Sequence, residues 1–179
     1  FTYMLDLGAN STCTAEQLYQ FALMGNVVAR EIKGIPSPKI ALLNIGEEEI
    51  KGHEMIKEAS ILLEQSSINY VGYVEGNDIV ENKADVIVTD GFTGNIAIKA
   101  MEGTIELMTS VLKDSIKNGS SDDSAFDGSR FALDIFKNSI DPRKHNGALL
   151  VGLNGIVVKS HGSSDSYGHY HAILTAVNE

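Results

Sequence analysis

The sequence predicts an α/β fold in which a mainly parallel sheet is flanked by helices. Short apolar runs typical of strands alternate with longer segments of helical periodicity along most of the chain. One of these runs, residues 84–89, is almost entirely apolar, as expected of a strand buried on both faces of a parallel sheet. The chain has 179 residues, which is enough for a substantial hydrophobic core.

The first helix has the clearest boundaries. An extended run over residues 2–7 is followed by Thr14 and Gln17, whose spacing predicts a capping box. Apolar residues at helical spacing continue from there to about Lys33. Gly34 is then the expected C-terminal stop of the helix.

The second repeat of strand and helix follows directly. Residues 40–45 form an apolar run that predicts a strand. Gly46 and the acidic residues 47–49 come next, and glutamates suit the positive end of a helix dipole. We therefore expect a helix from this point to about Gln65, and a third strand over residues 69–74.

The strand over residues 84–89 leads into a long helix expected over residues 96–117. Its apolar stripe is expected in the core, with a dimer interface as the alternative. The stripe comprises Ile105, Leu107, Met108, Val111 and Leu112. Residues 118–128 are rich in glycine, serine and aspartate and are expected to form a flexible loop, followed by an amphipathic segment over residues 131–140.

The last third of the chain contains two extended runs, residues 148–153 and 155–159, and a terminal helix that starts near Asp165. We find no internal repeat and no linker. We therefore expect residues 1–179 to form a single α/β domain or a fragment of one.

Composition narrows the classes of function. Acidic residues outnumber basic ones 24 to 14, so no nucleic-acid partner is expected, because such binding requires clustered cations. No apolar run approaches the roughly 20 residues of a membrane-spanning helix. The single cysteine, Cys13, excludes a disulfide within the chain and suggests a reducing cytoplasm.

Glycine and polar residues follow almost every predicted strand. Any one of these turns is explained by ordinary turn chemistry. Because the carboxyl ends of parallel strands lie along one edge of a sheet, five such turns together favour a ligand cleft there. The turns are Asp6 to Asn10, Asn44 to Glu47, Glu75 to Asn77, Asp90 to Gly91 and His161 to Asp165.

The turn from Asp90 to Asn95 has the most specific pattern, because it joins a buried strand to a long helix. Gly91 and Gly94 would let the backbone approach a ligand closely. Thr93, Asn95 and free N–H groups of the first helical turn could hold an anion. A plain Asx cap on the helix is the alternative. The segment matches neither a Walker A loop nor a dinucleotide-binding fingerprint.

Lys51 and His161 are the other candidate site residues. The ammonium group of Lys51 would neutralise a phosphate or an oxyanion over the cleft, with a solvated surface role as the alternative. His161 lies at a predicted strand end beside Ser163, where it could move a proton or bind phosphate. A hydrogen-bonded structural histidine is the alternative.

Four segments together resemble the PlsX family, the bacterial acyl-acyl-carrier-protein:phosphate acyltransferases of phospholipid synthesis. They are Leu5 to Asn10, Leu43 to Glu48, Thr89 to Asn95 and Gly155 to Ser164, in the family's order and spacing. The resemblance covers nearly the whole chain and is weakest from about Asn118 to Asn146. It implies a fold similar to isocitrate and isopropylmalate dehydrogenases.

The resemblance implies that inorganic phosphate takes a long-chain acyl group from acyl carrier protein, giving acyl phosphate without an organic cofactor. Lys51 and Asn95 match positions of the family's active site, for charge neutralisation and for hydrogen bonding to phosphate or the oxyanion. His161 is assigned as a phosphate ligand or as the acid that protonates the departing thiolate. Phosphate or substrate binding is assigned to Asp6, Asn10, Gly46, Asp90, Gly91, Thr93, Gly94 and Ser163. No metal ligands are expected.

Further partners are also implied by the resemblance. It implies a homodimer in the cytoplasm with a peripheral contact at the inner face of the membrane. The polar residues 119–124 depart from the hydrophobic helical tip of the family. Because acyl carrier protein is acidic, we expect it to dock on a basic face, with a solvated helix face as the alternative. That face comprises Arg130, Lys137, Arg143, Lys144 and His145.

Two other functions are kept as alternatives. One is a metal- and NAD-dependent β-decarboxylating dehydrogenase of the related fold, which would require a cluster of aspartates for the cation. The other is a non-catalytic module that binds acyl carrier protein. The family's chain also carries an N-terminal portion that builds the other wall of the cleft. This sequence is expected to lack that portion, and its activity as a fragment is left open.

Overall fold

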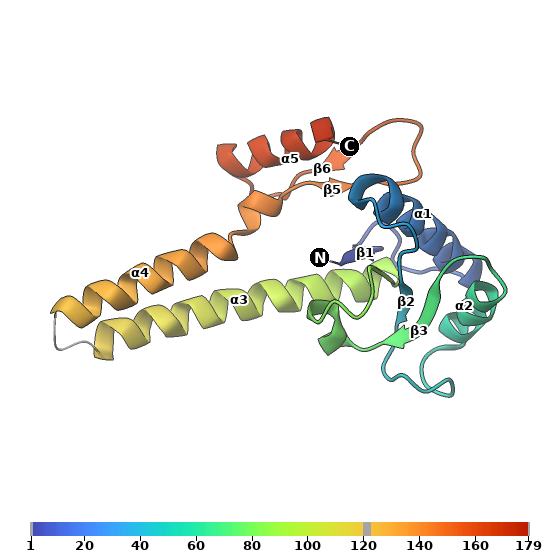
Figure 1. Ribbon diagram of the computed structural model, residues 1–179, viewed down its shortest axis with the longest axis horizontal. Helices are drawn as coiled ribbons and strands as arrows, with labels where there is room; N and C mark the ends of the chain where they lie inside the picture. The colour runs from blue at the N-terminus through green and yellow to red at the C-terminus, as the bar shows by residue number, and fades with distance from the viewer. Residues whose placement is uncertain (1, 120–122, 179) are drawn as a thin grey trace. The chain divides into compact units, whose positions relative to one another are not determined.

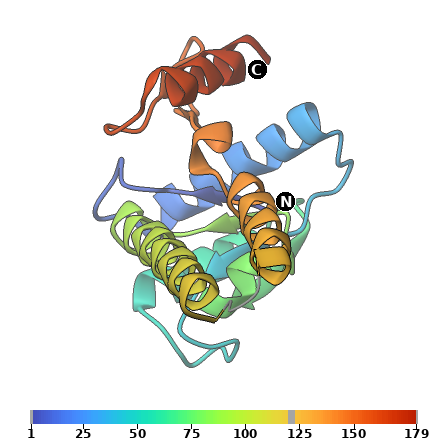
Figure 2. The ribbon, with the colours of Figure 1, turned by 90° about the vertical axis from the view of Figure 1, so that its left-hand side faces the viewer.

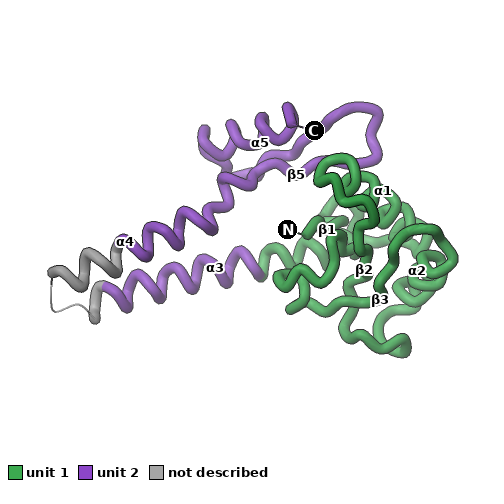
Figure 3. The backbone as a smooth tube through the Cα atoms, in the orientation of Figure 1, with its two compact units in different colours: residues 1–100 green, residues 101–179 purple. Residues whose placement is uncertain are grey.

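The computed structural model describes residues 2–119 and 123–178, and it describes side chains for residues 2–116 and 131–178. The chain divides into two compact units, residues 1–100 and residues 101–179 (Figure 3). Each unit is described by itself below.

Unit 1 contains a parallel four-stranded sheet in the order β1-β4-β2-β3. Strands β1, β2 and β3 are labelled in Figure 1. The helices and strands of unit 1 alternate along the chain, so the prediction of an α/β fold with a mainly parallel sheet is confirmed for this unit. The elements are β1 (Tyr3–Leu5), α1 (Ala15–Lys33), β2 (Ile40–Leu43), α2 (Glu54–Glu64), β3 (Tyr70–Val74), a 3₁₀ helix η1 (Gly76–Val80), β4 (Val86–Val88) and the start of α3 (Gly91–Gly119).

The two central strands of this sheet, β2 and β4, are buried on both faces, as the apolar run over residues 84–89 predicted. Alternate residues point to opposite faces. Ile40, Leu42 and Val86 belong to a core cluster that they share with α1 and α2. Ala41 and Ile87 belong to a second cluster on the other face of the sheet.

Helix α1 confirms the predicted capping box. The Thr14 hydroxyl accepts a hydrogen bond from the Gln17 backbone, and the Gln17 side chain accepts one from the Thr14 backbone. Gly34 ends the helix in the left-handed region at φ 65°. Gly25 allows α1 to approach β4 closely, because a Cβ there would lie 2.5 Å from Cγ1 of Val86.

Helix α2 begins at Glu54, so the prediction that it starts at the acidic residues 47–49 is wrong. Residues 46–52 form a loop instead. Gly52 explains the break, because its φ of 88° lies in the left-handed region and cannot continue a right-handed helix.

Helix α3 begins at Gly91, earlier than the predicted start at residue 96. The segment from Gly91 to Asn95 therefore belongs to the first turns of the helix. Asp90 directly precedes it, and its carboxylate accepts a hydrogen bond from the Thr93 backbone at 2.8 Å. This is the geometry of an N-cap, which fixes the start of the helix.

Unit 2 contains the rest of α3, then α4 (Asp123–Ser139), a 3₁₀ helix η2 (Pro142–His145), β5 (Ala148–Leu149), β6 (Val158–Lys159) and α5 (Ser166–Asn178). Strands β5 and β6 pair antiparallel in a separate two-stranded sheet. The placement of the His161 turn at an end of the parallel sheet is therefore wrong. Two short extended runs joined by a few residues can close on each other as a hairpin, and their sequence does not distinguish the two pairings.

Helices α3 and α4 lie side by side (Figures 1 and 2). Helix α3 continues to Gly119 and α4 begins at Asp123, so the predicted loop over residues 118–128 is too long. Residues 120–122 of that loop lie outside the described residues. The apolar stripe of α3, from Ile105 to Leu112, is 40–65% exposed, so its predicted burial in the core of this chain is wrong.

Candidate active site

The carboxyl ends of the four parallel strands lie next to one another. Leu5 pairs with Val88, and Val88 pairs with Leu42, so these three strands end in register. Hydrogen bonds continue past the strand ends, from the Asp6 backbone to Thr89 at 2.8 Å and from the Asn44 backbone to Val74 at 2.9 Å. Four of the five predicted turns therefore gather along one edge of the sheet.

The Asp6 carboxylate organises the turn after β1. It accepts hydrogen bonds from the backbone N–H groups of Gly8 at 3.0 Å, Ala9 at 2.9 Å and Asn10 at 2.6 Å, and from the Asn10 side chain at 2.8 Å. Burial alone would raise the pKa of Asp6, but these hydrogen bonds outweigh it and lower the pKa below its usual value. Asp6 therefore serves as the fixed anion of this turn.

The first turn of α3 packs directly against the turn after β1. The backbone N–H of Gly91 donates to the Asn10 carbonyl at 2.8 Å. A Cβ at Gly91 would lie 2.5 Å from that oxygen, and a Cβ at Gly94 would overlap the Asp6 carbonyl. The two glycines do permit a close backbone approach, but the approaching group is the protein's own turn.

Asp90 occupies the start of α3 with its own carboxylate. One oxygen accepts from the Thr93 backbone and the other from the Thr93 hydroxyl, both at 2.8 Å. Since Gly91 and Thr93 already donate within the protein, the expectation that the N–H groups of this turn are free is wrong for these two. The geometry is that of a plain Asx cap on the helix, which was the alternative interpretation of this turn.

Asn95 lies against the same turn. A Cβ placed on Gly8 would be 3.6 Å from Cβ and Cγ of Asn95, and Gly8 itself has a φ of 117°. We name this arrangement the β1–β4 corner. It brings together seven residues assigned to the site from sequence, which are Asp6, Asn10, Asp90, Gly91, Thr93, Gly94 and Asn95.

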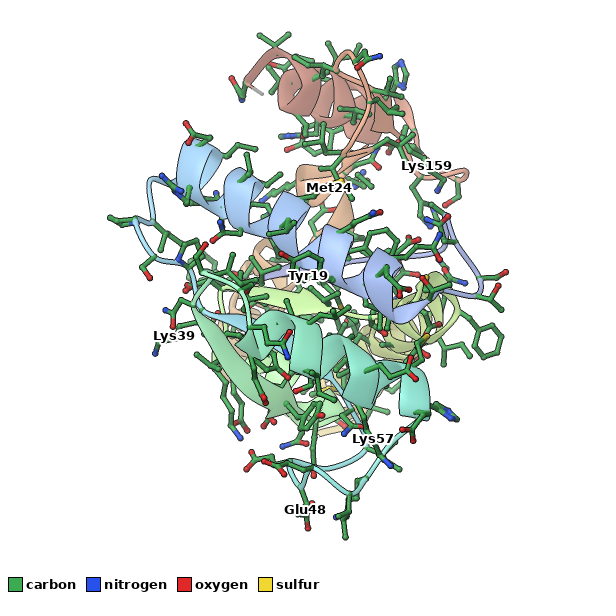
Figure 4. The ribbon with its side chains drawn as sticks, turned by 90° about the vertical axis from the view of Figure 1, so that its right-hand side faces the viewer. Tyr19, Met24, Lys39, Glu48, Lys57 and Lys159 are labelled. Carbon is green, nitrogen blue, oxygen red and sulfur yellow. The ribbon has the colours of Figure 1, made fainter. Side chains whose placement is uncertain are left out.

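Lys51 lies in the loop after β2, residues 44–52, which we name the β2 loop. Its ammonium group is 2.8 Å from the Glu48 carboxylate, and the two side chains are 44% and 60% exposed. The hydrogen bond that Lys51 donates to the Glu48 carboxylate raises the pKa of Lys51, so the ammonium group stays charged. Glu48 projects from this loop in Figure 4. Gly46 leaves room for the Lys51 side chain, which a Cβ at that position would overlap.

Asn44 anchors the β2 loop and was not identified from sequence as a site residue. It is buried, and its side-chain N–H donates to the Lys51 carbonyl at 3.2 Å. Its side-chain oxygen has no hydrogen-bond partner among the described residues and faces Gly52, where a Cβ would overlap it. Its position in the segment Leu43 to Glu48 was the available signal.

His161 and Ser163 come together in unit 2, in the turn between β6 and α5. The His161 Nδ1 lies 2.9 Å from the Ser163 hydroxyl and 3.3 Å from the Ser163 backbone nitrogen. Because the backbone N–H can only donate, Nδ1 accepts in this arrangement, and a neutral ring then carries its proton on Nε2. This matches the alternative of a hydrogen-bonded histidine and leaves the assigned chemistry untested.

The basic face expected to dock acyl carrier protein is partly neutralised. Arg143 donates to Asp141 at 2.8 Å and to Asp165 at 3.0 Å, and the hydrogen bond from Arg143 lowers the pKa of Asp141 to about 2. Lys144 donates to the carbonyl of Asn138 at 2.8 Å. Lys137 and Lys113 line a shallow cavity of about 340 Å³ in unit 2. The Arg130 side chain lies outside the described residues.

Three further features were considered among the described residues: a metal site, a cysteine nucleophile and a membrane-spanning helix. Among the described side chains, no group of three His, Cys, Asp or Glu residues is placed to hold a metal ion. Partial burial raises the pKa of the Cys13 thiol, and the charges of Asp90 and Asp6 act in the same direction, which disfavours a thiolate nucleophile. Within the described ranges, no helix is both long and apolar enough to cross a bilayer.

The chain is similar to one protein family and to several curated proteins that share one name. A family model described as fatty acid synthesis protein matches residues 1–178. A phosphate acyltransferase from Nitrosococcus oceani is 50% identical over 99% of this chain, and one from Alkalilimnicola ehrlichii is 49% identical over 100% of it. A third, from Magnetococcus marinus, is 46% identical over 99% of the chain. In each case the match covers 52% of the relative, so the chain spans about half the length of these curated relatives.

Proposed function

The chain belongs to the fatty acid synthesis protein family, and from this membership we propose that it forms part of a phosphate acyltransferase of phospholipid synthesis. An oxygen of inorganic phosphate attacks the thioester carbonyl of a long-chain acyl group on acyl carrier protein. The carbon–sulfur bond breaks, and the products are acyl phosphate and the free thiol of the carrier. The observation that carries the proposal is the 46–50% identity to proteins named phosphate acyltransferase over 99–100% of the chain.

The β1–β4 corner is the proposed phosphate and oxyanion site. This chemistry requires hydrogen-bond donors that are held in place before the reaction. Asn95 brings a side-chain amide to a corner whose backbone is fixed by Asp6 and Asp90. We assign the Asn95 amide to phosphate or the oxyanion. Asp6 and Asp90 are carboxylates that accept hydrogen bonds from their own turns, so we assign them to shaping the corner, together with Asn10, Thr93, Gly91 and Gly94.

Lys51 is the proposed cation of the site. Its ammonium group is paired with Glu48 in an exposed contact, and exposed ion pairs are weak enough to exchange partners. Phosphate would replace Glu48 as the counterion of Lys51, while Gly46 leaves the side chain room to move.

His161 and Ser163 are the proposed proton donor and phosphate contact in unit 2. The departing sulfur leaves as a thiolate and must gain a proton, and an imidazole is suited to supply one near neutral pH. Ser163 lies 2.9 Å from the ring and brings a hydroxyl to the same turn.

The remaining properties of the proposed protein rest on family membership. We propose a fold related to isocitrate and isopropylmalate dehydrogenases, a homodimer, and a cytoplasmic location with a peripheral membrane contact. The exposed apolar stripe of α3 supports the dimer, because large exposed apolar surfaces are typical of association sites. We further propose acyl carrier protein as the partner, with Lys137 as part of its dock.

The decisive experiment is an acyl-phosphate assay with acyl carrier protein thioester and inorganic phosphate. It requires this chain within a protein of the relatives' full length. Formation of acyl phosphate supports the proposal. Binding of acyl carrier protein without acyl phosphate would favour the non-catalytic module, and NADH formed from NAD, Mg²⁺ and isopropylmalate would favour the dehydrogenase.

Substitution of Lys51 or Asn95 by alanine tests the site within that full-length protein. Each should lower acyl-phosphate formation by about 10²-fold, the typical effect of losing one transition-state donor. Lys57→Ala and Asn154→Ala are the matched controls, since Lys57 lies on α2 and Asn154 is exposed in unit 2. Rates near the wild-type value in both Lys51→Ala and Asn95→Ala would remove the proposed site.

A further inference from the structure

Asn146 is the most heavily used polar side chain of unit 2. It lies between η2 and β5 and is 8% exposed. Its side-chain nitrogen is 2.9 Å from the hydroxyls of both Ser160 and Ser164 and 2.8 Å from the Gly168 carbonyl. Its side-chain oxygen accepts the backbone N–H of His161 at 2.9 Å. An amide nitrogen has only two hydrogens, so the three acceptors share them.

These contacts enclose the His161 turn from both sides. Ser160 precedes the histidine, Ser164 follows it, and Gly168 lies in the first turn of α5. A single buried side chain therefore holds the entrance, the middle and the exit of the turn. Loss of one member of a buried hydrogen-bond network leaves its partners unsatisfied, which costs more than one bond.

The backbone next to Asn146 is also closely packed. Gly147 has a φ of 115°, and a Cβ there would lie 3.0 Å from Thr175 Oγ1 and 3.0 Å from Val158 Cγ1. The backbone at Gly147 therefore packs closely against α5 and β6. The Thr175 hydroxyl lies 3.4 Å from the Asn146 carbonyl and ties the same residue to the helix.

We propose that Asn146 is a positioning residue that sets the orientation of His161 and Ser163 for phosphate. The proposal rests on the proposed function, because it takes His161 as part of the acyltransferase site. Asn146 fixes the His161 backbone, and the Ser163 hydroxyl and backbone then hold ring nitrogen Nδ1. Rotation of this turn would move both side chains together.

The first test is the steady-state kinetics of the full-length protein with Asn146→Asp. This variant keeps the size of the side chain but removes both N–H donors, and the Gly168 carbonyl cannot donate in return. We expect the KM for inorganic phosphate to rise at least about 10-fold, while the KM for acyl carrier protein thioester changes less than about 2-fold. Asn154→Asp, the same change at an exposed residue of unit 2, should alter neither value.

Ser164→Ala provides a milder variant if Asn146→Asp does not fold. It removes one partner of Asn146 and leaves the amide in place. Loss of one ordinary hydrogen bond corresponds to a rise of about 3-fold in the KM for phosphate. The proposal would be overturned if either variant raised the KM for phosphate and the KM for acyl carrier protein thioester equally. A fall in kcat with no change in the KM for phosphate would also overturn it.

A mutant cycle separates positioning from general stability. In a background that carries both His161→Ala and Ser163→Ala, Asn146→Asp should not raise the KM for phosphate further, because both residues that it positions are gone. A full additive effect would overturn the proposal and leave the acyltransferase function intact. Wild-type kinetics of His161→Ala would also overturn the proposal and leave the acyltransferase function intact.

Histidine-selective ¹⁵N NMR tests the geometry without turnover, with His161→Ala used to assign the signal. In spectra recorded on the neutral form of the ring, we expect the wild-type His161 to have Nδ1 as an acceptor, because the Ser163 backbone N–H donates to it. Asn146→Asp should give a mixture of the two tautomers. An unchanged tautomer in the variant would overturn the proposal about Asn146, whether or not the protein forms acyl phosphate. The absence of acyl phosphate in the wild-type assay would instead refute the proposed function.

Discussion

The β1–β4 corner and the β2 loop follow neighbouring strands of one sheet, yet they are built in opposite ways. In the corner, buried Asp6 accepts hydrogen bonds from three successive backbone N–H groups, and Gly91 and Gly94 bring a helix onto the same turn. In the β2 loop, Lys51 and Glu48 form an exposed pair. The corner is therefore expected to be rigid and the loop adjustable.

This difference suggests a division of labour in the proposed site. A donor that stabilises an oxyanion must be fixed in advance, because its reorganisation would cost free energy during the reaction. A cation that collects phosphate from solvent can be mobile. Asn95 lies in the β1–β4 corner and Lys51 in the β2 loop. Each of the test variants below changes only one of these two regions.

The largest effect is expected from Gly94→Ala, which places a methyl group on the Asp6 carbonyl. The backbone of the corner has to shift, and such overpacking destabilises a protein by about 3 kcal/mol in severe cases. Acyl-phosphate formation should fall at least about 10-fold with it, because Asn95, the proposed transition-state donor, is displaced. Chemical denaturation and the acyl-phosphate assay measure the two effects.

Gly103→Ala is the control on the same helix. A Cβ at Gly103 meets no atom within 4 Å, and alanine is favoured over glycine in a helix by about 1 kcal/mol. The control should be as stable as the wild type or slightly more so. Equal destabilisation by both variants would show that helix propensity, and not the contact with Asp6, explains the result.

Asp6→Asn should have the next largest effect. It keeps the shape but replaces an acceptor that serves several N–H groups, which at pH 7 should cost about 2 kcal/mol of unfolding free energy. Because folding lowers the pKa of Asp6, its contribution is present above the unfolded pKa of about 4 and is lost as the pH falls through the lower folded value.

Urea denaturation at several pH values tests this sign. The stability difference between wild type and Asp6→Asn should be largest near neutrality and should shrink as the pH falls below about 4. A difference that stays constant down to the lowest accessible pH would show that the charge of Asp6 does not stabilise the corner.

Glu48→Gln should have the smallest effect on stability. The Glu48–Lys51 pair is exposed, so we expect the unfolding midpoint to stay within experimental error. The KM for phosphate should fall by about 2-fold, because the Lys51 ammonium loses a competing carboxylate. Glu54→Gln, which removes a comparable exposed partner from Lys57, is the control. A rise in the KM for phosphate would contradict the role proposed for Lys51.

Local signals predicted the parts of the fold that depend on neighbouring residues. Thr14 and Gln17 predicted the start of α1, and Gly34 its end, because a capping box and a C-terminal glycine act within a few residues. The start of α2 was misplaced, because acidic residues suit both a helix start and an exposed loop. Gly52 is left-handed and leaves no room for a Cβ beside the Asn44 side chain, and the local pattern shows neither feature.

The candidate site was predictable to a similar extent. Parallel strands necessarily end at one edge, so the grouping of Asp6, Asn10 and Asp90 followed from the predicted topology. The antiparallel pairing of β6 could not be predicted, because it depends on a partner strand of two residues. Asn146 was missed for the same kind of reason, since its partners lie 14–22 residues away and no motif links them.

The continuity of α3 across the boundary between the two compact units has a practical consequence for dissecting the protein. Residues 91–100 belong to unit 1 and residues 101–119 to unit 2, yet all are turns of one helix. A truncation after Ala100 would leave less than three turns of helix, and its last carbonyl groups would lose their hydrogen-bond donors. Expression of the first unit by itself should therefore end at a later, capped position of this helix, since the contact boundary offers no flexible linker to cut.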